Sequence, residues 1–196
     1  MGARNAEKFN LAARWAALAL AGLLLAAPLA AVTMRALSLD ELVQTSDRVV
    51  VATIVSNEGR WDDAGAKIFT YTTIRVDEYI KGDGASGDTL VIVTLGGAVG
   101  DKGMHIEGAP IFRPGDKEVL FLYSDAGSSD FGVRGWNQGR FKVLTHPDTG
   151  QEMVVRSLTG TRIVGTAGGK TKSEFSSIRT LDDLRTAVRS RSGKGE

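Results

Sequence analysis

Cysteine is absent from this chain of 196 residues, and its absence excludes several kinds of protein. Without thiols there is no disulfide scaffold, no thiolate metal site, no cysteine nucleophile and no lipid anchor on cysteine. An excess of charge of one sign is also missing, because 24 Lys and Arg stand against 23 Asp and Glu. Nucleic-acid binding needs a basic surface, so we expect no nucleic-acid partner. Hydrophobic residues make up 42% of the chain, which is sufficient for the packed core of one domain.

Residues 1–31 have the pattern of an export signal. Three bases within the first 14 residues precede an uncharged run from Trp15 to Ala27, and small residues follow it. This pattern is typical of a secretory signal peptide, which we expect to be cut after Ala31. The alternative is an uncleaved membrane anchor, because the uncharged run from Trp15 to Met34 is long enough to span a bilayer.

Cleavage would leave 165 residues with a net charge of −1, since the removed segment carries three bases and one acid. We therefore predict a secreted or periplasmic protein of the cell envelope. Contact with a membrane is expected only if the N-terminal segment is retained.

Two segments carry helix-capping patterns. Ser38 is followed three residues later by Glu41, which is a capping box and predicts a helix over 39–45. Thr180 precedes two aspartates that suit the first turn of a helix over 178–191. That helix has an apolar stripe, which we expect to dock on the domain, formed by Ile178, Leu181, Leu184 and Val188. The alternative use of this helix is contact with an anionic surface through Arg185, Arg189 and Arg191.

Between these helices the sequence reads as strands separated by turns. The predicted strands are 48–55, 67–80, 89–95, 118–123, a fifth over 131–144 that is broken at 137–139, and a short return over 152–155. A meander of three strands, a long connection and two more strands indicate a small Greek-key barrel of the OB type. We predict a mainly β fold with this five-stranded barrel and the N-terminal helix over 38–158. Residues 159–177 have the composition of a flexible linker.

The connection over 96–115 differs from the rest of the domain. It holds six glycines and two prolines in 20 residues without a clear period. Long segments of this kind are uncommon in compact domains and are often functional. We therefore expect this loop to take part in binding.

Three short motifs resemble those of netrin-like modules, the superfamily that includes the tissue inhibitors of metalloproteinases. Residues 46–55 read SDRVVVATIV, 79–83 read YIKGD and 112–122 read FRPGDKEVLFL. The corresponding family patterns are ADVVVxGxV, VxxVxKG and FxxGxxYLLFL. The resemblance covers roughly 46–145 and implies the same OB-like barrel. The inhibitors chelate the zinc of the protease with an N-terminal cysteine, which this chain lacks, so no inhibitory residue is carried over.

The chain is also similar to exported bacterial proteins of unassigned function. Those proteins show GAPxFxxGExVLLFL followed by GxxQGxFxV, and here residues 108–112 read GAPIF and 135–141 read GWNQGRF. No activity follows from this second resemblance.

Candidates for catalysis are few. His105 lies beside Glu107 in the glycine-rich loop, whereas His146 lies in a separate turn, so the two histidines show no ligand spacing. Serine is never set in a Gly-x-Ser-x-Gly elbow, and Gly96–Gly100 lacks the Gly-Lys-Ser/Thr ending of a phosphate loop. We predict no catalytic residue, no metal and no cofactor, and hence not an enzyme.

Residues with exposed aromatic or polar groups near turns are the binding candidates. They are Trp61, His105, Phe112, Trp136, Gln138 and Arg140. Exposed aromatic rings stack on sugars or on a partner's anchor residue, although a tryptophan can equally fill a small core. The leading hypothesis is a binding module that recognises another exported protein, with proteases among the candidates. The alternatives are a barrel that binds a glycan or small molecule, and a purely structural envelope protein.

Overall fold

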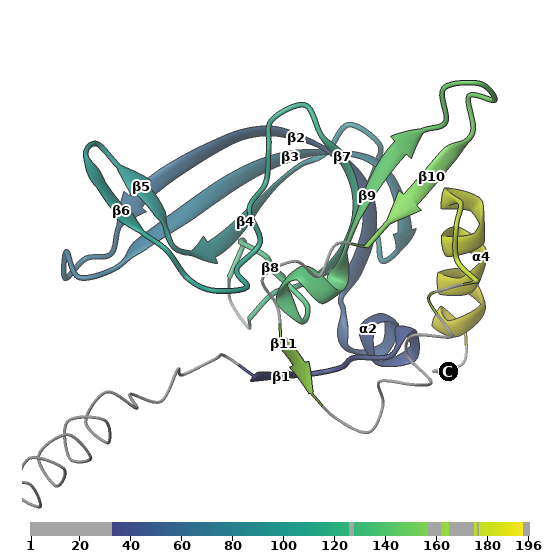
Figure 1. Ribbon diagram of the computed structural model, residues 1–196, viewed down its shortest axis with the longest axis horizontal. Coiled ribbons are helices and arrows are strands. Elements are labelled where there is room, and N and C mark those ends of the chain that lie inside the picture. Colours follow the sequence, from purple (N-terminus) through teal and green to yellow (C-terminus); the bar gives the residue numbers. More distant parts are fainter. Residues whose placement is uncertain (1–32, 126–127, 157–161, 165–174, 176, 194–196) are drawn as a thin grey trace, which may run out of the picture. The chain divides into compact units, whose positions relative to one another are not determined.

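The computed structural model describes residues 33–125, 128–156, 162–164, 175 and 177–193. The fold is mainly β, with an antiparallel sheet and a helix toward each end of the described chain (Figure 1). The elements in chain order are β1 (Thr33–Arg35), α2 (Leu39–Thr45), β2 (Arg48–Trp61), β3 (Ile68–Lys81), β4 (Thr89–Leu95), β5 (Gly97–Val99), β6 (Lys102–Met104), β7 (Lys117–Tyr123), β8 (Gly132–Val133), the 3-10 helix η1 (Trp136–Gly139), β9 (Arg140–Thr145), β10 (Glu152–Val155), β11 (Arg162–Val164) and α4 (Leu181–Ser192).

The main sheet has seven strands rather than the predicted five. Its order is β10-β9-β7-β2-β3-β4, and β8 pairs with β7 beside β9. Two features account for the difference. The predicted fifth strand is divided by η1 into β8 and β9, close to the expected break, and the short return β10 joins the sheet next to β9.

Strand β2 is longer than the sequence predicted. It continues six residues past Val55 to Trp61, and throughout that stretch it pairs with β3. The added segment, SNEGRW, is polar and contains a glycine, so its own strand propensity is weak. Pairing with β3 in a long hairpin therefore stabilises a strand that the local sequence alone does not favour.

Phe131 and the residues after it connect β4, at one edge of the sheet, with β7, in its middle. The N–H of Phe131 donates to the Val91 carbonyl (2.9 Å), and its own carbonyl accepts from the N–H of Val93 (2.8 Å), which gives a parallel bridge to β4. The next residues form β8, which pairs with β7. Thus the segment 131–133 touches β4 and β7.

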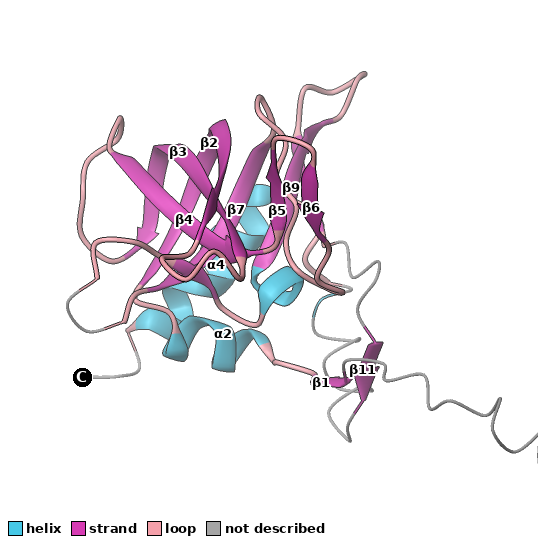
Figure 2. Cartoon of the chain, turned by 90° about the vertical axis from the view of Figure 1, so that its left-hand side faces the viewer, coloured by secondary structure: helices cyan, strands magenta, loops and turns pink. Residues whose placement is uncertain are grey.

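Alternating side chains divide the buried residues into two cores. The helix-side core joins the sheet to α2 and α4, shown in cyan in Figure 2, and comprises Leu39, Leu42, Val43, Val49, Val51, Ile80, Val119, Phe121, Phe141, Val143, Val154, Leu181, Leu184 and Val188. The loop-side core lies on the other face and comprises Val50, Ala52, Ile54, Ile74, Val76, Ile92, Phe112, Leu120, Leu122, Phe131 and Val133.

Both predicted helices are present, with capping boxes at Ser38 and Thr180. The second helix begins at Leu181 and not at 178, because Thr180 is its N-cap. The apolar stripe of α4 docks as expected on the helix-side core. The arginines of α4 make ion pairs within the chain instead of forming a free basic row. Arg185 and Arg189 both donate to the Glu78 carboxylate, at 2.8 and 2.9 Å, and Arg191 donates to Asp40.

The remaining domain predictions fall mainly on undescribed residues. The predicted signal peptide, 1–31, lies outside the described residues, as does most of the predicted linker, 159–177. Within that linker, β11 pairs in parallel with β1, and the Phe175 ring lies 5.8 Å from Phe141. In the described part of the chain no helix has the length and hydropathy needed to cross a bilayer.

Candidate functional site

The glycine-rich loop lies directly on the backbone of the long β2–β3 hairpin. Its first part forms the small hairpin β5–β6, and the second part, 105–112, returns toward β7. A Cβ atom added to Gly59 would lie 2.0 Å from the Ala98 carbonyl oxygen, and one added to Gly97 would lie 2.1 Å from the Thr70 hydroxyl oxygen. Glycine at 59 and at 97 therefore permits a contact that any side chain would block.

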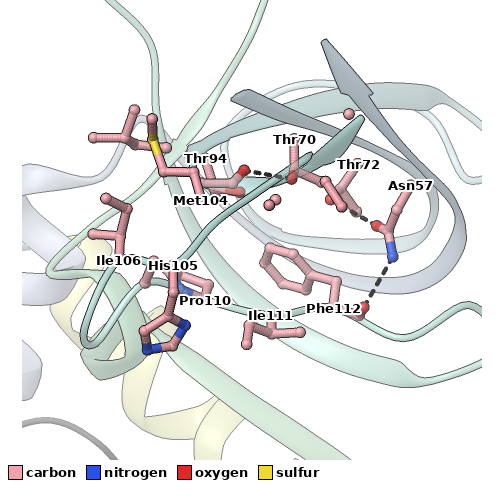
Figure 3. A pocket seen from close by; sticks show the side chains of 17 residues that line it. Asn57, Thr70, Thr72, Thr94, Met104, His105, Ile106, Pro110, Ile111 and Phe112 are labelled. Atoms are coloured by element: carbon pink, nitrogen blue, oxygen red, sulfur yellow. Dashed lines mark hydrogen bonds between the residues drawn. The ribbon is translucent and has the colours of Figure 1, made fainter. Parts of the chain in front are cut away.

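Hydrogen bonds hold the two ends of the loop to the strands (Figure 3). The Thr70 hydroxyl donates to the Gly96 carbonyl over 2.6 Å, and the Asn57 amide donates to the Phe112 carbonyl over 2.9 Å. The buried Thr72 hydroxyl in turn donates to the Asn57 amide oxygen over 2.8 Å. The loop is thus attached by polar side chains on β2 and β3.

A hollow of about 600 Å³ remains between the loop and the strands, and we call it the first hollow. It is lined by Asn57, Gly59, Thr70, Thr72, Thr94, Leu95, Gly96, Gly97, Ala98, Gly103, Met104, His105, Ile106, Ala109, Pro110, Ile111 and Phe112. Apart from His105 its lining has no ionisable side chain. Hydroxyl, amide and apolar groups make it suited to an uncharged side chain or ligand.

A second hollow of about 410 Å³ lies on the other side of residues 105–111. Its lining is charged and comprises His105, Ile106, Glu107, Gly108, Ala109, Ile111, Arg113, Asp116, Asn137, Arg140, Lys142 and Val155. Four residues line both hollows, so the segment 105–111 forms a ridge between them. Ile111 on this ridge is 67% exposed.

A buried ion pair supports the second hollow. Arg140 donates two hydrogen bonds of 2.6 Å to the carboxylate of Glu118, which is fully buried, and its guanidinium lies 4.6 Å from the centre of the Phe112 ring. Lys142 and Asp116 form a second, more exposed pair at 2.8 Å. Arg140 and Lys142 at this hollow are therefore held in place by carboxylate partners.

Three of the six predicted binding residues meet at the ridge: His105, Phe112 and Arg140. Phe112 is buried in the loop-side core, so its contribution is to support the ridge. The His105 Nε2 lies 3.4 Å from Glu107 Oε2, and both side chains are exposed. Within the described ranges no cluster of three or more His, Cys, Asp or Glu is arranged to hold a metal.

The other three predicted residues line neither hollow. Trp61 is 42% exposed at the end of β2. Trp136 begins η1 with a φ of 57° and is half-buried. Gln138 is buried, and its side-chain amide donates to the Arg35 carbonyl (3.0 Å) while its oxygen accepts from the N–H of Leu37 (2.8 Å). Gln138 therefore fixes the segment that precedes α2.

Sequence reasoning missed Ile111 and the polar residues of β2 and β3 that line the first hollow. One available signal was Gly59, because a glycine inside a strand often marks the close approach of another backbone. Ile111 has no comparable signal, since its exposure depends on how the whole loop folds.

No protein-family model, curated protein or solved structure matches this chain. The geometry of the ridge and its two hollows is therefore the basis for assigning a function.

Proposed function

We propose that this chain is an exported, non-enzymatic binding module that holds another exported protein on the ridge 105–111. The observation that carries the proposal is the pair of hollows on either side of an exposed ridge. A partner's side chains would enter both hollows, while Ile111 would be covered at the centre of the contact. A central apolar anchor with polar groups around it is the usual arrangement of a protein interface.

The contrast between the hollows favours a protein partner over a single small ligand. The first hollow would take an uncharged side chain, and the second would take a polar or charged one beside Arg140 and Lys142. A volume of about 600 Å³ also fits a small ligand, which keeps the glycan alternative as a second candidate. Against a glycan bound by ring stacking, Trp61 and Trp136 lie outside both hollows.

We further propose that the sheet is an OB-like barrel of the netrin-like kind. Support comes from the contacts of Phe131 with β4 and of the following residues with β7. Together with the pairing of β2 with β3 and β7 and of β3 with β4, these contacts would close a ring in the order β2, β3, β4, 131–133 and β7. Five strands in Greek-key order are the arrangement of an OB barrel. The proposal of export is supported by the signal-peptide pattern of residues 1–31.

Affinity capture tests the protein-binding proposal. The full chain is immobilised and exposed to the secreted and periplasmic fraction of the producing cells, and bound proteins are identified by mass spectrometry. We expect one saturable partner whose capture is lost with Ile111→Asp and kept with Leu144→Asp, a matched change at a residue that is 45% exposed and lines neither hollow. Equal capture by both variants, or no saturable partner, would contradict the proposal.

Titration with oligosaccharides, followed by tryptophan fluorescence, tests the second candidate. The protein-binding proposal predicts no saturable change. A saturable change that Trp136→Ala abolishes would favour the glycan instead. The mass of the mature protein, measured in the same preparation, shows whether residues 1–31 have been removed.

A further inference from the structure

The outer half of β2 has a free edge. Strand β7 pairs with β2 only over 48–53, and just beyond it Ile54 bonds to Gly115 and Asp116. From Asn57 to Trp61, β2 has β3 on one side, and among the described residues no strand pairs on the other side. An exposed edge of this kind is a template for pairing with another strand.

The hydrogen-bond pattern fixes which backbone groups face that edge. The Asp62 N–H donates to the Lys67 carbonyl, so Asp62 directs its backbone groups toward β3. Because this direction alternates along an antiparallel strand, Asn57, Gly59 and Trp61 direct theirs away from β3. The Ile68 carbonyl, opposite Trp61, accepts from Gly96 on the far side of β3, which agrees with this alternation.

We propose that this edge pairs antiparallel with the same edge of a second copy of the chain, with Gly59 facing Gly59. A two-fold axis at that residue sets Asn57 opposite Trp61 and Glu58 opposite Arg60 of the second copy. The pairs at 57, 59 and 61 would exchange six backbone hydrogen bonds in total. The two pairs between 58 and 60 would be of the non-hydrogen-bonded type, in which the side chains are closest.

Charge complementarity is the reason for choosing a second copy as the occupant. Glu58 and Arg60 already pair within one chain, at 2.7 and 2.8 Å, and in the dimer each would also face the opposite charge of the other copy. Opposite charges directly across a strand pair stabilise it, and like charges destabilise it. A second copy necessarily presents Arg60 opposite Glu58 and Glu58 opposite Arg60 at this register, whereas the strand of an unrelated protein would match these charges only by coincidence.

The charged pairs of the dimer would lie away from the proposed binding site. Side chains alternate along β2, so Glu58 and Arg60 lie on the opposite face from Asn57 and Gly59, which line the first hollow. Trp61 shares the face of Asn57, so the dimer would set Trp61 of the second copy beside that end of the first hollow and cover part of its exposed side chain. The inference rests on the strand edge and its charges, and not on the proposed function.

Sedimentation of two complementary variants tests the pairing. We expect the full chain to associate to a dimer at concentrations up to about 1 mM. Glu58→Lys alone and Arg60→Glu alone should each weaken association by about tenfold, because both cross-strand pairs become repulsive. An equimolar mixture of the two variants should recover the dimer, since every pair between 58 and 60 again joins opposite charges. No change confined to one chain can produce this recovery.

Arg75→Glu is the matched control. Like Arg60, Arg75 is an exposed arginine on the same hairpin with an acid two residues away, Asp77 at 3.8 Å, but it lies away from the free edge. This variant should dimerise as the original chain does, and circular dichroism should show all variants folded. A monomer at every concentration, an equal loss with Arg75→Glu, or a mixture that stays monomeric would overturn the proposal.

Discussion

The helix side and the loop side of this sheet are covered by different kinds of contact. On the helix side, α2 and α4 insert branched apolar side chains such as Leu42 and Leu184, and these are completely buried. On the loop side, over the outer part of β2 and β3, the covering segment approaches through backbone atoms and is held by Thr70 and Asn57.

This difference in packing explains why a hollow remains on the loop side of the sheet. Interlocking apolar side chains fill the volume between layers to the density of a crystal. A backbone that rests on glycines brings few side chains to fill the gap, and here it leaves a hollow of about 600 Å³. The helix side therefore contributes mainly to stability, and the loop side offers room for a partner.

The largest effect is expected on the helix side. Leu184→Ala removes a fully buried side chain of α4 and should lower the free energy of unfolding by about 2–5 kcal/mol. Urea denaturation followed by circular dichroism measures this change. Leu144→Ala, at an exposed position, should change the free energy of unfolding by less than about 0.5 kcal/mol. Similar values for the two variants would show that α4 is not packed as described.

The next largest effect is expected at the second hollow, where the two ion pairs should differ in how much they stabilise the fold. Glu118→Gln leaves Arg140, whose side chain is 18% exposed, without its countercharge, and should cost about 2 kcal/mol of stability. Asp116→Asn breaks the more exposed pair with Lys142 and should cost about 0.5 kcal/mol. The same urea experiment compares them. If Asp116→Asn proved the more harmful, the burial of the Glu118 pair would not be what gives it strength.

A smaller effect is expected where the loop rests on the hairpin. Gly59→Ala introduces a methyl group 2.0 Å from the Ala98 carbonyl, so the loop must move, at a cost of about 1–2 kcal/mol. Capture of the partner should weaken as well. Gly193→Ala is the control, because no atom lies within 4 Å of a Cβ there and the residue lines neither hollow. Unchanged stability and capture in Gly59→Ala would contradict the close contact.

The smallest effect is expected on the loss of folding stability at low pH. The N–H of Ser38 lowers the pKa of Glu41, with a further contribution from Arg35, and the N–H of Thr180 lowers the pKa of Asp183. A carboxyl whose pKa is lower in the folded state stabilises the fold at neutral pH, and this contribution is lost as the pH falls through the ordinary carboxyl range toward the folded value. The double variant Glu41→Gln, Asp183→Asn should therefore show a shallower loss of stability between about pH 6 and pH 3. An unchanged pH dependence would mean that the two caps do not titrate with folding.

Local patterns were sufficient to predict the helix side from the sequence. The capping residues Ser38 and Thr180 fix where the helices begin, and the spacing of Leu181, Leu184 and Val188 identifies the face that packs. These signals act over one or two helical turns, so they can be read without knowledge of the rest of the fold.

The loop side depends on contacts between distant residues. The sequence identified the loop as unusual, and His105, Phe112 and Arg140 as candidates, but it did not reveal that Asn57 would hold Phe112 or that Ile111 would be exposed. The extension of β2 to Trp61 was missed for the same reason, since pairing with β3 outweighs the weak propensity of that segment.

Amide hydrogen exchange of the full chain, free and with its captured partner bound, tests most directly whether the loop side is the binding side. In the free protein, residues 97–112 should exchange faster than Val49 to Val51, which lie in the middle of the sheet. Binding should slow exchange over 105–112 and leave α2 and α4 unchanged. Slower exchange over the helices with no change in the loop would contradict the proposed role of the ridge.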